Sequence, residues 1–167
     1  MSVDDASVAL KCLGVLIIIA ACVHICREYS FALTHTVSLA RDAVGFMTYA
    51  EGAVRAWRDP CERIISSYAP DYDGAAPFWK YAANHSLALA LKSEYAASFD
   101  DATREQLEAY ASASGRGYKE DELMLIESVK NKLQANADEL EARSDGDKKT
   151  FYAVMSFLGV CLIILTI

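Results

Sequence analysis

The cysteine and histidine side chains near the N-terminus are the residues best suited to bind a metal. Cys22, His24 and Cys26 follow one another within a single short stretch. In a helix, Cys22 and Cys26 share a face because they lie one turn apart, whereas His24 points elsewhere. A zinc site needs about four converging ligands. We therefore interpret these residues as helix-packing or interfacial residues and predict no metal site.

The chain has three histidines, His24, His35 and His85. His24 and His35 are separated by about three helical turns and would share one helix face. A haem ligand near a membrane edge is therefore an alternative, since haem iron accepts histidine. A second axial ligand would have to come from His85 or from another chain. Solvent-facing or interfacial histidines are the preferred interpretation, and we predict no cofactor.

Asp71, Asp73 and Gly74 have the spacing that begins a calcium-binding loop. The position of the closing glutamate is occupied by Ala82, and the other ligands are missing, so we reject this site. The sequence also lacks a nucleophile–base motif, a glycine-rich phosphate loop and an HExxH pair. We predict a protein that is not an enzyme and has no small-molecule substrate. A redox subunit that uses the histidines is the least supported alternative.

Two apolar runs lie near the ends of the chain. Thr150–Ile167 carries no charge, and Val8–Ile25 is interrupted only by Lys11, which can extend to the interface. Roughly 17–25 helical residues cross a bilayer, so both runs are long enough to span one. Asp4 and Asp5 precede the first run, which is the reverse of the positive leader of a signal peptide. We predict an uncleaved, two-span integral membrane protein.

Charged and aromatic residues flank the inner ends of both runs. Positive charges next to a span favour the inner side of a membrane, and aromatic residues favour its interface. We therefore expect the middle region on the positive-inside side, most plausibly in the mitochondrial inner membrane, with both termini opposite. The predicted membrane-interface anchors are Arg27, Tyr29, Phe31, Lys148, Lys149, Phe151 and Tyr152.

Composition narrows the class further. The 167 residues carry a formal net charge of -7, which argues against a nucleic-acid surface. Of five cysteines, only Cys61 lies far from the apolar runs, so no disulfide framework can hold the middle region. We expect reduced thiols that behave as small hydrophobic residues.

Apolar residues at three- and four-residue spacing predict two long helices that continue the apolar runs. The first extends from about Val8 to Trp57 and ends at Asp59-Pro60; the second starts at Tyr118 and is interrupted at Ser144–Asp147. We predict an all-α fold in which a transmembrane helical hairpin continues into an antiparallel stalk with a small helical head. The expected segments are a first span (1–27), stalk helix 1 (28–59), the head (60–117), stalk helix 2 (118–149) and a second span (150–167).

The head sequence predicts three helices. One follows Pro60, one begins at Pro77 and extends to Phe99 with apolar residues all round, and one is capped by Asp100 or Asp101 and closed by Gly115 and Gly117. Aromatic residues in the head are interpreted first as core and alternatively as a docking surface. The candidate partner-contact residues are Trp57, Phe78, Trp79, Tyr81 and Tyr95.

These features favour a non-catalytic structural or accessory subunit of a multi-subunit membrane complex. Organellar respiratory-chain and ATP-synthase complexes have accessory subunits of this character, which is an analogy and not a motif match. The expected partners are other membrane-protein subunits and the lipid bilayer. The alternative is a membrane-anchored tether or adaptor whose helical head recruits a soluble partner.

Overall fold

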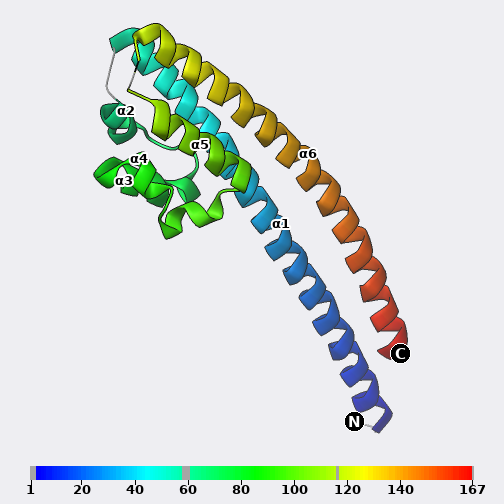
Figure 1. The fold of residues 1–167 in the computed structure, drawn as a ribbon. Helices are drawn as coiled ribbons and strands as arrows, with labels where there is room; N and C mark the ends of the chain where they lie inside the picture. Colours follow the sequence, from blue (N-terminus) through cyan, green and yellow to red (C-terminus); the bar gives the residue numbers. More distant parts are fainter. Residues whose placement is uncertain (1–2, 58–60, 116, 167) are drawn as a thin grey trace. The chain divides into compact units, whose positions relative to one another are not determined.

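The computed structural model describes the backbone of residues 3–57, 61–115 and 117–166, and the side chains of 13–56, 62–115 and 117–164. The described chain is all-α and contains no strand (Figure 1). It divides into two compact units. The end unit combines residues 1–34 with 142–167, and the central unit comprises residues 35–141.

Two long helices contribute to both units: α1 (Val3–Trp57) and α6 (Lys119–Thr166). The predicted end of the first helix at Trp57 is confirmed, and neither Gly45 nor Gly52 interrupts it. The predicted interruption at Ser144–Asp147 is wrong, because α6 is helical throughout that segment. A glycine inside a helix costs about 1 kcal/mol relative to alanine. Gly146 is therefore tolerated when the residues on both sides continue the helix.

Between the long helices lie short elements: α2 (Cys61–Ser67), the 3-10 turn η1 (Asp73–Ala75), α3 (Ala76–His85), α4 (Leu87–Ala90), the 3-10 turn η2 (Glu94–Ser98) and α5 (Asp101–Ala113). The predicted single helix from Pro77 to Phe99 is wrong. Ser86 has extended backbone angles (φ 160°, ψ 160°), and its Oγ accepts a hydrogen bond from Leu89 N at 3.3 Å. This side-chain bond begins a new helix, because serine competes with the helical backbone for hydrogen bonds.

The predicted helix after Phe99 is confirmed as α5. The Asp100 carboxylate accepts a hydrogen bond from Thr103 N at 3.0 Å, which caps the helix, and Gly115 follows its end with φ +77°. Asn136 on α6 donates through Nδ2 to Asp100 Oδ2 at 2.9 Å and to Thr103 Oγ1 at 3.0 Å. The N-terminal cap of α5 is thereby joined to α6 by the Asn136 side chain.

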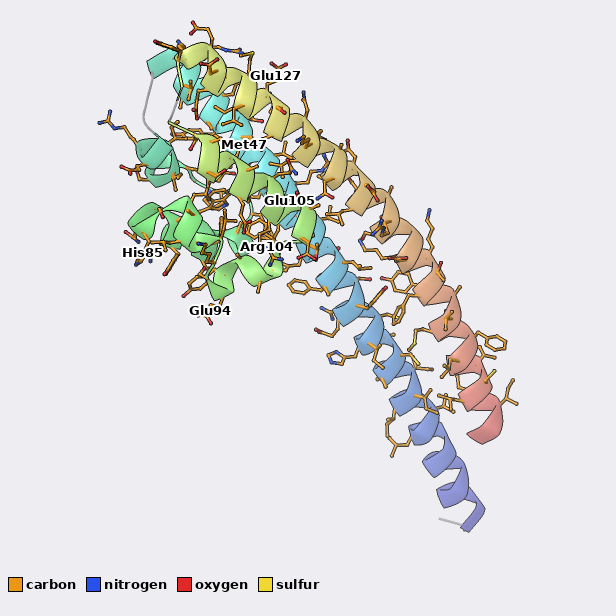
Figure 2. All side chains as sticks on the ribbon, viewed as in Figure 1. Met47, His85, Glu94, Arg104, Glu105 and Glu127 are labelled. Atoms are coloured by element: carbon orange, nitrogen blue, oxygen red, sulfur yellow. The ribbon has the colours of Figure 1, made fainter. Side chains whose placement is uncertain are left out.

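The core of the central unit joins both long helices to the short elements. Met47 of α1, Leu107 and Tyr110 of α5 and Leu133 of α6 are fully buried; Figure 2 shows Met47 where α1 passes the short helices. Burying a large apolar side chain contributes roughly 1.5–3 kcal/mol. The predicted stalk segments therefore share one core with the predicted head within this unit.

Candidate functional site

The predicted interface residues of the end unit form a band that joins α1 and α6. The rings of Tyr29 and Phe151 stack with centroids 4.1 Å apart, and Ser30 Oγ hydrogen bonds to the Tyr152 hydroxyl. Lys148 Nζ donates to Thr34 Oγ1 at 3.1 Å. The structure thus brings together four of the seven predicted anchors, and it places them at one level along the helix pair.

The other three predicted anchors do not enter these contacts. Arg27 and Lys149 are exposed, and the Phe31 side chain is 67% exposed. An exposed cation and an exposed aromatic ring beside the band are the residue types found where a helix meets the headgroup region of a bilayer.

Within the end unit, many large apolar side chains of α1 before Arg27 and of α6 after Tyr152 are exposed. The exposed apolar residues of this surface are Leu13, Leu16, Ile17, Ile19, Val23 and Ile25 on α1, and Val154, Phe157, Leu158, Val160, Leu162 and Ile164 on α6. Exposed apolar side chains in this number mark a contact with lipid or with another protein. We define these residues as the apolar surface of the end unit.

One helical segment in the described part of the chain, Leu13–Ala56, is long and apolar enough to cross a membrane. None of its most apolar stretch is buried inside the protein. Burial along α1 begins at Leu39, so this stretch precedes it. The second apolar run includes residues 165–167, whose side chains lie outside the description.

A groove of about 450 Å³ lies within the end unit, between α1 and α6. Its walls are mostly aliphatic, and Gly159 lies on its floor, where a Cβ atom would be 3.6 Å from Cys22 Sγ. Among the described residues that line this groove, Arg27 is the only charged one. Cys22, Cys26 and Cys161 are free thiols. The described residues include no group of three or more His, Cys, Asp and Glu side chains that could hold a metal ion.

A polar site that the sequence analysis missed lies in the central unit around Asp42, a buried residue of α1 that is 4% exposed. Its Oδ2 accepts a hydrogen bond from Trp79 Nε1, and its Oδ1 accepts bonds from the Tyr68 hydroxyl at 3.2 Å and from Asp71 N at 3.1 Å. Burial raises the pKa of the Asp42 carboxyl above its ordinary value, against the opposing effect of these donors. A single acidic residue between apolar residues Leu39 and Met47 is the only sequence signal for this site.

The Asp42 site has the properties of a structural cluster. Burial first, and then the neighbouring Asp42 charge, raise the pKa of the Tyr68 hydroxyl, so this group stays protonated and acts as a donor. Phe78 and Trp79 are each 2% exposed and belong to the core. The docking interpretation therefore does not hold for these two aromatic residues, because a partner cannot reach them.

Tyr81, His85 and Tyr95 form a second aromatic group, at the surface of the central unit. The His85 and Tyr81 rings stack with centroids 4.1 Å apart, and the Tyr95 ring lies 5.4 Å from Tyr81. Tyr95 is 41% exposed, and Figure 2 shows His85 at the outer side of the short helices. These residues line a shallow depression of about 310 Å³ together with Pro77, Lys80 and Asn84. The side chain of Trp57, the remaining candidate, lies outside the described residues.

The histidines proposed as alternative haem ligands have protein partners in the central unit. His35 Nδ1 hydrogen bonds to the Tyr72 hydroxyl at 2.6 Å, and His85 Nδ1 lies 3.1 Å from the carbonyl oxygen of Tyr81. His24 is exposed in the end unit. The described contacts therefore give each of the two central histidines a tyrosine neighbour.

Comparison of the chain with protein-family models, with curated proteins and with solved structures gives no match. The structure defines the class coarsely, as an all-α protein with one long apolar helix near the N-terminus that meets the length and composition of a membrane span.

Proposed function

We propose that this chain is a non-catalytic accessory subunit of a multi-subunit membrane complex, in which it contributes to assembly and stability. Two membrane spans, formed by the parts of α1 and α6 that belong to the end unit, would anchor the chain, and the central unit would lie on the positive-inside side. An organellar respiratory-chain or ATP-synthase complex in the mitochondrial inner membrane is the most plausible setting. The observation that carries the proposal is the apolar surface of the end unit.

The contacts in the band support a two-span arrangement. Tyr29, four residues after the first apolar run, stacks on Phe151 near the start of the second, so both runs extend from about the same level. From Phe151 to Thr166, α6 rises roughly 23 Å at 1.5 Å per residue, which approaches the thickness of a bilayer's hydrocarbon core, about 30 Å. Lys148 and Arg27 at this level suit the inner headgroup region.

The composition of α1 and α6 within the end unit favours the role of an accessory subunit over that of a transporter. Among the described side chains of α1 before Arg27 and of α6 after Lys149, none is charged. Proton and ion pathways use ionisable residues that face a membrane interior. Packing against neighbouring subunits or lipid is the role that an uncharged, outward-facing apolar surface can serve.

Extraction and native electrophoresis of the tagged full-length chain test the proposal. We expect the chain to remain in membranes after alkaline carbonate washing and to comigrate with a large complex after mild detergent extraction. Protease should reach the central unit only from the positive-inside side. Release by carbonate would contradict the membrane placement, and a small species after mild extraction would contradict the subunit role.

The alternative function, a tether that recruits a soluble partner, is favoured by the Tyr81–His85–Tyr95 group. Exposed aromatic residues around a depression are the residues that most often anchor protein interfaces. Replacing Tyr81 and Tyr95 together by alanine should then release a soluble partner and leave membrane integration unchanged. Tyr118→Ala is the matched control, because Tyr118 is 80% exposed and lies outside the group. An unchanged set of copurifying proteins in the double variant would contradict the tether.

A further inference from the structure

The groove of the end unit combines an apolar floor with one cation at one end. Its lining residues are Ile18, Ile19, Cys22, Val23, Cys26 and Arg27 on α1, and Tyr152, Met155, Ser156, Gly159, Val160 and Ile163 on α6. Arg27 and Tyr152 are the residues nearest the band, and every residue further along the groove is uncharged. The groove is therefore positively charged at the end next to the band and uncharged along the rest of its length.

The length of the groove and its apolar walls suit a hydrocarbon chain. The α1 residues from Ile18 to Arg27 span about 14 Å of helix axis. The groove has a volume of about 450 Å³, and its lining beyond Arg27 and Tyr152 is mostly aliphatic. An extended acyl chain can therefore lie along it, between α1 and α6.

The positive charge of Arg27 at the end of the groove favours a lipid with an anionic headgroup. Arg27 brings a guanidinium group to this end of the groove, and none of the ion pairs among the described residues involves it. Tyr152 is oriented by its hydrogen bond to Ser30, and Lys148 lies one helical turn before Tyr152 on the same face of α6. Arginine binds phosphate through several donors at once, and basic sites between membrane helices on the inner side bind anionic headgroups.

We propose that this groove is a binding site for an anionic phospholipid, with one acyl chain lying between α1 and α6 and the phosphate held by Arg27. The inference rests on the proposed membrane placement of the end unit. Gly159, which has no side chain, and the small side chains of Ser156 and Cys22 leave room in the groove for the acyl chain.

Lipid retention by the full-length chain tests the site. The detergent-solubilised protein is titrated with phosphatidylglycerol or phosphatidylcholine, and the bound lipid is counted by native mass spectrometry. We expect preferential retention of phosphatidylglycerol and about a fivefold loss of that preference in Arg27→Gln. Gly159→Leu, which fills the floor, should reduce retention of both lipids. Lys92→Gln, an exposed position of the central unit, is the control and should behave as the wild type.

Carbonate extraction of the membranes from which the protein is solubilised separates this inference from the proposed function. Release of the chain by carbonate would overturn the membrane placement and the lipid site with it. A chain that stays in the membrane but retains both lipids equally, with no effect of Arg27→Gln, would overturn the lipid site alone. A photo-crosslinker at Met155 should capture lipid, and capture of another polypeptide in its place would show that a partner subunit occupies the groove and would also overturn the inference.

Discussion

The indole nitrogen of Trp79 donates a hydrogen bond to the Asp42 carboxylate inside the central unit, joining α3 to α1. Both residues are nearly inaccessible to solvent. Tyr68 and the backbone N–H of Asp71 donate to the same carboxylate, so one buried acid organises the loop between α2 and α3. Removing this carboxylate leaves the buried Trp79 indole N–H without its acceptor.

Asp42→Asn should lower the free energy of unfolding by about 1–3 kcal/mol, because the amide has one acceptor oxygen where the carboxylate has two, leaving Trp79 Nε1 unpaired. Urea unfolding of the full-length chain in detergent, followed by far-ultraviolet circular dichroism, measures the loss. Asp73→Asn, at an exposed position, should change stability by less than about 0.5 kcal/mol. In the double variant with Trp79→Phe, the loss of unfolding free energy should be smaller than the sum of the two single losses, because both remove the same hydrogen bond. Fully additive losses would contradict the coupling between Asp42 and Trp79.

The same carboxyl should give a pH dependence of unusual sign. Because burial raises its pKa in the folded chain, the folded state retains this proton at pH values where the unfolded chain has lost it. Its contribution to stability is therefore greatest below the ordinary aspartate pKa of about 3.9 and falls as pH rises through the raised value. Asp42→Asn should remove this component, and identical pH profiles for variant and wild type would argue against the assignment.

Asp100 should contribute the opposite pH dependence. Burial alone would raise the pKa of its carboxyl, but hydrogen bonds from Thr103 and Asn136 outweigh it and leave the pKa below its ordinary value. This stabilisation is present above about pH 4 and is lost as the pH falls through the lowered value. Asp100→Asn keeps a competent helix cap and should lose that acid-dependent part of the stability. Denaturation curves at pH 6 and pH 3 measure how much stability the variant and the wild type each lose on acidification. An equal loss in both would contradict this role of Asp100.

Ser86 sets the boundary between α3 and α4. Ser86→Ala should destabilise the central unit by about 1 kcal/mol, because Leu89 N loses its capping acceptor, and Ser86→Gly should cost only a few tenths. Thermal unfolding of the two variants against the wild type measures the difference. Ser112→Ala, on the exposed side of α5, should have little effect. A glycine variant less stable than the alanine variant would be inconsistent with a capping role.

Reversing the charge of the two lysines next to the band, Lys148 and Lys149, should impair membrane insertion or assembly. Lys148→Glu combined with Lys149→Glu places negative charge where a positive-inside flank is expected, and it removes the bond from Lys148 to Thr34. The carbonate-resistant fraction and the yield of the native complex are the measurements. Lys92→Glu combined with Lys132→Glu changes the net charge equally at exposed positions of the central unit and should leave both unchanged. Normal integration and yield in the first variant would exclude the anchoring role.

Local patterns in the sequence were sufficient for most helix boundaries. The end of α1 at Trp57, the cap of α5 at Asp100 and the glycine after that helix follow from capping and breaking rules that act over a few residues. The apolar runs at the ends of the chain are equally local signals, because they are recognised from composition and length alone. The break at Ser86 was not predicted, although the serine cap that causes it is itself a local feature. The predicted interruption at Ser144–Asp147 was wrong, because α6 is helical throughout that segment.

Spatial relationships required the folded chain. Apolar periodicity shows that an aromatic residue prefers burial, but Trp79 is buried and Tyr95 is exposed because of where their helices pack. The Asp42–Trp79 and Asn136–Asp100 bonds join residues far apart in sequence, and no local rule pairs them. The amino-acid order therefore specified the helices and the apolar ends, whereas the buried polar sites and the groove beside Arg27 arise from the packing of those helices.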